Sequence, residues 1–151
     1  MTQRERMARH ILDRFAVEPE YLWARYPNYA VFRQPASRKW FAVIMDVARK
    51  SLDLAGDGTA DVMDLKCGPM LVGSLLAQDG FRPAYHMSKS SWISVLLDET
   101  LSDEEIYPLI ELSYDSVTLK QKKSLFLLRS CGVLCRCAAS SMASSWAASA
   151  Q

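Results

Sequence analysis

The residues with the most chemical potential gather in the stretch FRPAYHMSKSSW, from Phe81 to Trp92. Arg82 and Lys89 could hold phosphate groups there while Tyr85 or Trp92 stacks on a nucleic-acid base. Alternatively, Tyr85 and Trp92 anchor the loop in the core, and the imidazole of His86 satisfies a backbone group. We expect Tyr85 and Trp92 to be structural and Arg82 to face solvent, and both interpretations stay open for His86 and Lys89.

No catalytic or metal-binding constellation can be assembled from the local spacing. The chain has two histidines, His10 on an expected helix face and His86 in a loop, and Cys67 stands alone at a strand end. A catalytic triad needs a nucleophile, a base and an orienting group, and zinc needs three or four suitable ligands. The loop AGDGTA also lacks the Lys-Ser/Thr pair of a phosphate-binding loop. We predict a protein that is not an enzyme, with no metal and no cofactor.

Aspartates in and around the predicted strands suggest a second metal interpretation, because hard cations bind carboxylate oxygens. They are Asp53, Asp57, Asp61 and Asp64. Their spacing does not match a calcium-binding loop, and acidic side chains at outward strand positions commonly keep a sheet soluble. We therefore expect these four carboxylates to be solvated.

Composition and charge narrow the class of protein. The chain has 151 residues, enough for one ordinary domain, and its formal net charge is +1. A nucleic-acid role must therefore rest on a local patch of positive charge. Neither a signal peptide nor an apolar run of membrane-spanning length is visible, so we expect a cytoplasmic protein without a membrane role. The four cysteines are expected to be reduced thiols.

The first expected element is an amphipathic helix near the N-terminus. Met7, Ile11 and Phe15 recur every four residues and predict one apolar face. Thr2 and Glu5 have the spacing of a capping box at the start of this helix.

Short apolar runs separated by turn residues then predict an antiparallel sheet. Residues 29–33 and 39–47 flank a hairpin loop, residues 50–54 and 61–67 flank AGDGTA, and residues 92–98 form a further buried strand. Residues 39–47 are apolar at successive positions, which indicates a central strand covered on both sides.

Two more helices are expected to pack on this sheet. Pro69 suits a first helical position and Gly80 a helix end. Ser102 and Glu105 form a second capping box, and Pro108 should introduce a kink or an early irregular turn. The sum is a two-layer α+β fold in which helices pack on an antiparallel sheet.

The composition changes sharply near the C-terminal end. Residues 124–151 contain no acidic residue and are dominated by Ser, Ala, Leu and Cys. We interpret residues 1–123 as one domain and residues 124–151 as an atypical tail, either poorly ordered or a short docking helix. The spacing of Cys131, Cys135 and Cys137 matches no common zinc site.

Several motifs together resemble the MmcQ/YjbR family of small bacterial proteins. They are YPNYAVFR, KWFAVIMDV, LKC followed by GSL, PAYHM with a later WISVLLD, and EIYPLIELSYD. The resemblance covers roughly residues 1–118 in the same order. It implies a compact α+β fold similar to CyaY and frataxin, with a proposed double-wing DNA-binding character. The positions that carry the family signature are Tyr85, His86, Met87, Lys89, Trp92, Lys66 and Cys67.

The leading hypothesis is a non-enzymatic DNA-binding module. Its expected contact residues are Lys66, Arg82, His86 and Lys89, joined by Arg6 and Arg9 if the fold brings them near. The alternative is a small-ligand or protein-partner module whose pocket is lined by Tyr85, His86 and Trp92. A frataxin-like role in metal handling fits less well, because the first helix is basic.

Overall fold

The computed structural model describes residues 1–118. The end of the predicted 1–123 domain and the predicted tail 124–151, including Cys131, Cys135 and Cys137, lie outside the described residues.

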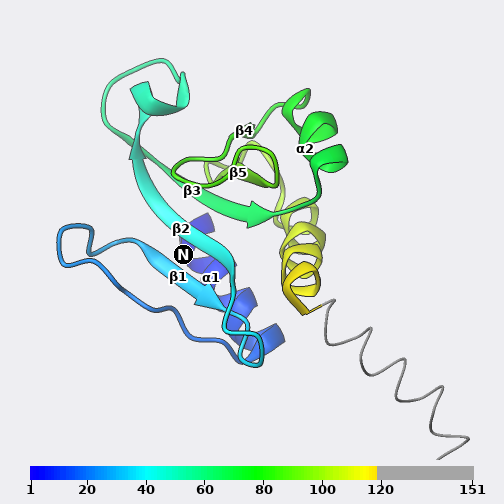
Figure 1. The fold of residues 1–151 in the computed structure, drawn as a ribbon. Coiled ribbons are helices and arrows are strands. Elements are labelled where there is room, and N and C mark those ends of the chain that lie inside the picture. Colours follow the sequence, from blue (N-terminus) through cyan, green and yellow to red (C-terminus); the bar gives the residue numbers. More distant parts are fainter. Residues whose placement is uncertain (119–151) are drawn as a thin grey trace, which may run out of the picture. The chain divides into compact units, whose positions relative to one another are not determined.

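An antiparallel sheet of five strands forms the centre of the described part, in the order β1-β2-β3-β5-β4 (Figure 1). The strands are β1 (Ala30–Arg33), β2 (Trp40–Ala48), β3 (Thr59–Lys66), β4 (Phe81–Pro83) and β5 (Trp92–Leu96). Every neighbouring pair is antiparallel. The predicted strands at 29–33, 39–47, 61–67 and 92–98 therefore correspond to β1, β2, β3 and β5.

Two predictions about the strands were wrong. Residues 50–54 do not form a strand, because the chain makes the 3₁₀ turn η1 (Arg49–Leu52) and then adopts left-handed geometry at Asp53, with φ 53°. Buried Leu52 and half-buried Leu54 gave the strand pattern, although a single turn is enough to bury Leu52. Conversely, β4 was expected to be loop. Its Pro83 is tolerated because β4 is an edge strand.

The helices follow the predicted pattern more closely. Helix α1 (Gln3–Phe15) begins with the Thr2/Glu5 capping box, and α2 (Pro69–Leu76) begins at Pro69. Helix α2 ends at Leu76, with Ala77 as its C-cap, rather than at Gly80. Residues 103–118 are helical without interruption across Pro108, so the irregular turn expected there is absent and a kink remains the prediction. Within residues 1–118, no helix is both long enough and apolar enough to cross a membrane.

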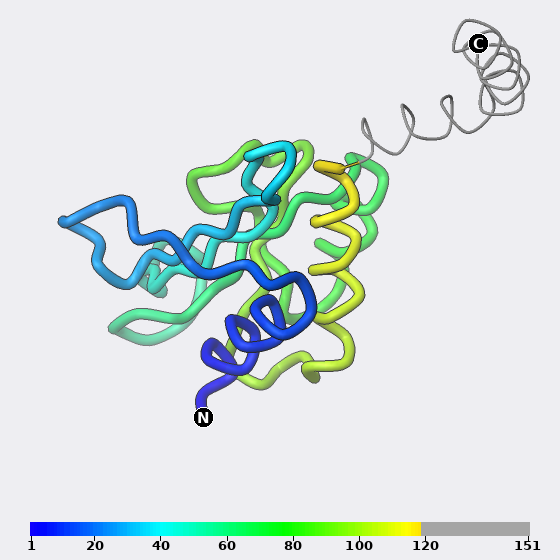
Figure 2. Tube along the Cα trace, turned by 90° about the horizontal axis from the view of Figure 1, so that it is seen from below, coloured from blue at the N-terminus to red at the C-terminus, as the bar shows by residue number. Residues whose placement is uncertain are grey.

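The two faces of the sheet have different cover. We call the first the helix face: its core joins the sheet residues Ile44 and Met63 to Ile11 of α1 and Ile110 of the 103–118 helix. These two helices lie side by side (Figure 2), with His10 stacked on Tyr107 at 3.8 Å between ring centroids. The two-layer α+β prediction is confirmed.

The opposite face, which we call the loop face, carries a second apolar cluster. It includes Val31, Val43, Met45 and Val62 from the strands, with Leu52 from η1. The residues of β2 are mostly buried on both faces, which confirms that residues 39–47 form a strand covered on both sides. The loop face is covered by η1 and irregular segments instead of long helices.

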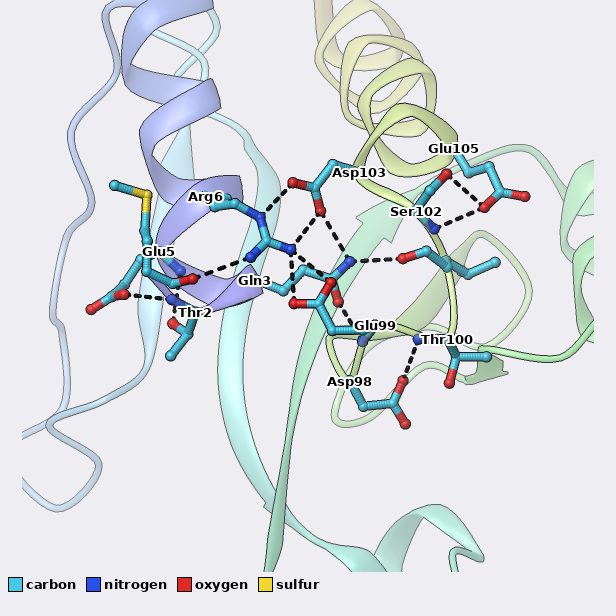
Figure 3. A network of polar contacts seen from close by, with 12 residues as sticks. Thr2, Gln3, Glu5, Arg6, Asp98, Glu99, Thr100, Ser102, Asp103 and Glu105 are labelled. Atoms are coloured by element: carbon cyan, nitrogen blue, oxygen red, sulfur yellow. Dashed lines mark hydrogen bonds and ion pairs between the residues drawn. The ribbon is translucent and has the colours of Figure 1, made fainter.

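A polar network ties the start of α1 to the segment that leads into the 103–118 helix (Figure 3). The buried amide of Gln3 donates to the carbonyl oxygen of Leu101 at 2.8 Å and accepts from the backbone N–H of Glu99 at 2.9 Å. Arg6 forms ion pairs with Glu99 and Asp103, and its hydrogen bond to Asp103 lowers the pKa of that carboxyl. These contacts hold α1 and the 103–118 helix together at one end.

Candidate ligand-binding site

Strand register places a row of side chains across the loop face. Val43 of β2 lies opposite Asp64 of β3, and Asp64 lies opposite Ser94 of β5. Ser94 in turn lies opposite Arg82 of the edge strand β4. The row passes from an apolar residue through two fully buried polar residues to a half-buried cation.

Asp64 is buried, so its predicted place on a solvated face was wrong. The Ser94 hydroxyl donates to its Oδ1, and no hydrogen bond reaches its buried Oδ2 from the described residues. Burial raises the pKa of Asp64 to about 7, although the hydrogen bonds from Ser94 and the Tyr85 backbone act in the opposite direction. The alternating pattern predicted that Asp64 lies on an outward, solvated face. That prediction failed because the loop face, like the helix face, is covered.

The other three aspartates differ among themselves. Asp61 is half-buried and pairs with Arg4 at 2.9 Å. Asp53 and Asp57 are exposed, as predicted, and Asp57 lies 3.6 Å from the ammonium of Lys50. Within residues 1–118, no three His, Cys, Asp or Glu side chains gather to hold a metal ion.

The segment Tyr85-His86-Met87 is fixed to this buried polar pair. The backbone N–H of Tyr85 donates to the Ser94 hydroxyl at 3.1 Å. His86 adopts left-handed backbone geometry with φ 59°, and its ring lies 4.0 Å from that of Tyr85 between centroids. The three residues of this segment line two separate cavities. Three of the family-signature residues, Tyr85, His86 and Met87, therefore form a wall shared by the two cavities.

The first cavity, which we call the aromatic cleft, has a volume of about 360 Å³. Its aromatic residues outside the shared wall are Trp23, Tyr26, Tyr29 and Trp40, and the sheet contributes Val43 and Met45. Trp23 is 37% exposed and Tyr26 is 44% exposed, although both are large apolar side chains. A preformed aromatic surface of this kind is typical of sites that bind small organic molecules.

The rings of the aromatic cleft hold one another in place. Trp23 meets Trp40 nearly edge-on, with centroids 5.9 Å apart and planes at 85°, and Tyr26 stacks on Tyr29 at 4.8 Å. The guanidinium of Arg33 lies over the Trp40 ring at 5.4 Å and pairs with Glu20 at 3.0 Å. Mutual packing of this kind restricts the conformational freedom of the rings before a ligand binds, so that binding loses less conformational entropy.

The loop that carries Trp23 and Tyr26 is attached to the sheet at both ends. At its start, Glu20 and Val31 exchange backbone hydrogen bonds of 2.8 and 2.9 Å. Near its end, the Asn28 side chain donates to Asp46 of β2 at 3.3 Å, and Arg4 of α1 donates to the Asn28 carbonyl oxygen. The cleft therefore depends on a loop fixed by contacts distant in sequence.

The second cavity, which we call the basic cavity, has a volume of about 420 Å³. Arg82 and Lys89 line it together with the shared wall, η1 residues and Asp53. Within residues 1–118 neither cation forms an ion pair, and Arg82 donates to the carbonyl oxygen of Phe81 at 2.9 Å. Arg82 is half-buried rather than fully solvent-facing. The basic cavity thus holds two cations against one carboxylate.

The structure brings together three of the four residues expected to contact DNA. Arg82, His86 and Lys89 line the basic cavity, but Lys66 lines neither cavity, and its backbone N–H is bonded to Ser113 at 2.8 Å. Trp92 is buried, also lines neither cavity, and lies opposite Lys66. The expected pocket of Tyr85, His86 and Trp92 therefore differs from either cavity, because Trp92 belongs to the interior.

The basic residues of α1 do not join this group. Arg6 pairs with Glu99 and Asp103, and Arg9 pairs with Asp13 at 3.3 Å. Helix α1 packs on the helix face, whereas Arg82 lines a cavity with Leu52 of the loop-face cluster. The expected DNA-contacting residues are thus divided between two sides of the sheet.

Sequence reasoning missed the aromatic residues of the cleft. The available signal was the run YLWARYPNY over residues 21–29, where tyrosine and tryptophan recur in a segment with no clear strand or helix period. Trp40 was interpreted only as part of a strand. Neither observation indicated that the loop would fold back over β2 and place both tryptophans in one cavity.

Comparisons with known proteins give one consistent family. Residues 12–116 match the YjbR family. The uncharacterized protein YyaQ of Bacillus subtilis is 40% identical over 114 residues, which span 76% of this chain and 97% of that protein. The uncharacterized protein YjbR of Escherichia coli is 34% identical over 70 residues, which cover 44% of this chain and 59% of that protein.

Solved structures agree with the sequence comparisons. A crystal structure of a Pseudomonas syringae protein has a TM-score of 0.74 at 40% identity, covering 76% of this chain and 97% of that one. A Deinococcus radiodurans protein has the same type of fold, with a TM-score of 0.55 at 22% identity over 73% of this chain and 75% of that one. The resemblance noted in the sequence is confirmed, and the chain belongs to the YjbR family.

Proposed function

We propose that this protein binds a small organic molecule and that the flat, apolar part of this ligand occupies the aromatic cleft. The observation that carries the proposal is the pair of partly exposed rings, Trp23 and Tyr26, in a preformed cavity of about 360 Å³. That volume lies within the range of ordinary small-molecule sites. The proposed activity is binding, and no reaction is assigned to the cleft.

The geometry of the rings supports a flat ligand. Trp23 and Trp40 stand nearly perpendicular, at 85°, and therefore form a corner. A planar ring system can stack on one indole and present its face or edge to the other, the arrangements that aromatic pairs prefer. The floor of Val43 and Met45 adds apolar contact, and a methionine side chain adapts to irregular ligand shapes.

A neutral fluorescent probe tests the proposal directly. N-phenyl-1-naphthylamine should bind saturably to the folded protein, with energy transfer from tryptophan to the probe. Because Trp23 supplies an exposed ring of the cleft, Trp23→Ala should weaken binding at least about tenfold. Tyr21→Ala is the matched control, since Tyr21 is 62% exposed in the same loop but does not line the cleft.

Two results would contradict this function. One is the absence of saturable probe binding to folded wild-type protein, with circular dichroism as the check on folding. The other is an equal loss of affinity in Trp23→Ala and Tyr21→Ala, which would place the probe outside the cleft.

DNA binding remains a second candidate, supported by the gathering of Arg82, His86 and Lys89 at one cavity. A salt titration with single-stranded and duplex DNA tests it, because phosphate contacts make affinity fall steeply as salt rises. Lys89→Ala should weaken binding, whereas Arg9→Ala should not, because Arg9 is paired with Asp13 on the helix face. No binding at low salt, or an unchanged Lys89→Ala variant, would reject this candidate.

A further inference from the structure

The two cavities of the loop face meet at the same three residues. Tyr85, His86 and Met87 line both the aromatic cleft and the basic cavity. A ligand that fills the cleft and reaches across this wall therefore enters surroundings of different chemistry. The cleft is dominated by aromatic and apolar side chains, whereas the basic cavity contains two cations.

The cations of the basic cavity differ from most arginines of the described part. Five of the other arginines each form an ion pair with a carboxylate: Arg4, Arg6, Arg9, Arg14 and Arg33. No ion pair engages Arg82 or Lys89 within residues 1–118. Their positive charge is thus available to a ligand.

Arg82 is well placed to bind an oxyanion. Its position on β4 is fixed by strand pairing with Ser94, and one guanidinium nitrogen is occupied by the Phe81 carbonyl oxygen at 2.9 Å. The remaining N–H groups keep the planar fork that matches carboxylate, sulfonate or phosphate oxygens. Arg82 is also half-buried, which strengthens its attraction for an anion relative to a fully solvated cation.

Building on the proposed function, we infer that the ligand is an amphiphilic acid: its flat apolar part lies in the aromatic cleft, and Arg82 and Lys89 bind its anionic group in the basic cavity. His86 lies in the wall that the ligand crosses. Asp53 lines the same basic cavity and opposes the bound anion. The balance of two cations against one carboxylate favours a single anionic group.

Two probes that share one ring system separate this inference from the proposed function. N-phenyl-1-naphthylamine is neutral, and 8-anilino-1-naphthalenesulfonate carries one sulfonate on the same rings. We expect the folded protein to bind the sulfonate probe about tenfold more tightly at low salt, and this preference should shrink as salt screens the cations.

Variants of the basic cavity should act on the sulfonate probe alone. Lys89→Ala and Arg82→Gln should each weaken binding of the sulfonate probe several-fold and leave the neutral probe unchanged. Asp53→Asn should tighten binding of the sulfonate probe, because it removes the opposing charge. Asparagine also suits the left-handed geometry of residue 53, with φ 53°, so this variant should fold.

The outcomes are distinguishable. The inference fails, and the proposed function stands, if the neutral probe binds in the cleft and the sulfonate probe binds no more tightly. The same conclusion follows if none of the three variants changes the affinity for the sulfonate probe. If neither probe binds, the proposed function fails as well. Displacement of the sulfonate probe by a single-stranded oligonucleotide, but not by a mononucleotide at the same phosphate concentration, would overturn the small-ligand assignment in favour of DNA.

Discussion

The helix face and the loop face of the sheet both carry apolar strand residues, but different kinds of segment cover them. On the helix face, Ile11 and Ile110 pack directly onto the sheet, and the polar groups at the helix ends are paired. On the loop face, irregular segments leave two cavities. One contains exposed rings, and the other contains Arg82 and Lys89, which form no ion pair within residues 1–118. The difference is consistent with a helix face that supplies stability and with our proposal that the loop face binds a ligand.

Aromatic stacking between α1 and the 103–118 helix contributes to the close packing of the helix face. His10 stacks on Tyr107 at 3.8 Å, and Phe15 stacks on Tyr114 at 4.1 Å. Burial lowers the pKa of His10, so its neutral form is favoured in the folded protein. This histidine therefore acts in packing, whereas His86 stands at the wall of both cavities.

The largest loss of stability is expected on the helix face. Ile110→Ala should lower the free energy of unfolding by about 2–5 kcal/mol, because truncation of this fully buried side chain leaves a cavity in the core. Urea unfolding measures this change. Leu112→Ala on the same helix is the control, since Leu112 is 42% exposed and should cost less than about 1 kcal/mol. Equal losses in the two variants would contradict the packing described for this face.

Asp64 should make the loop face sensitive to pH. Because its pKa is raised from 3.8 to about 7, the folded protein binds more protons than the unfolded chain between these values. Stability should therefore fall as pH rises from about 4 to about 7, by up to about 4 kcal/mol from this group. Asp64→Asn should flatten the dependence measured by urea unfolding at several pH values.

The matched control for this pH dependence is Asp57→Asn, which changes an exposed carboxylate near Lys50. Its profile should run parallel to that of the wild type. If the Asp64→Asn profile also runs parallel to that of the wild type, the pKa of the Asp64 carboxyl is not raised by burial as described.

An intermediate effect is expected where the polar network joins the helices (Figure 3). Gln3→Ala should cost about 1–3 kcal/mol, because the carbonyl oxygen of Leu101 and the N–H of Glu99 lose their partner in a buried region. Thermal unfolding measures the change, with exposed Gln78→Ala as the reference. A Gln3→Ala variant as stable as Gln78→Ala would show that the network contributes no net stability.

The smallest change in stability is expected in the aromatic cleft. Trp23→Ala should alter the free energy of unfolding by only about 1 kcal/mol, because this ring is 37% exposed, yet it should remove most probe binding. Urea unfolding and probe titration of the same preparation test both statements. A loss as large as that of Ile110→Ala would contradict the distinction between a stabilising helix face and the proposed ligand-binding face.

Local sequence rules predicted the elements that depend on local physics. The Thr2/Glu5 capping box begins α1, and Pro69 begins α2, because these residues act on the backbone beside them. The apolar run of β2 also predicted cover on both faces. The same rules failed for residues 50–54, where burial of Leu52 in a single turn gives the pattern of a strand.

The candidate site was predicted only in part. Arg82, His86 and Lys89 were found because they are close in sequence and share one loop and edge strand. Trp23 and Trp40 were not, because their contact depends on a loop folding back over the sheet. Burial of Asp64 was also missed. The alternation of side chains along a strand shows which residues share a face of the sheet, but it does not show whether other segments cover that face.

The sequence by itself determined the family, the helix starts and the apolar strands of an α+β fold, because propensity, capping and periodicity act over a few residues. Only the tertiary structure decided that Arg6 and Arg9 lie with the helix face, and that Tyr85, His86 and Met87 separate an aromatic cleft from a basic cavity. Those placements depend on strand order and on long-range contacts, which residue spacing along the chain does not encode.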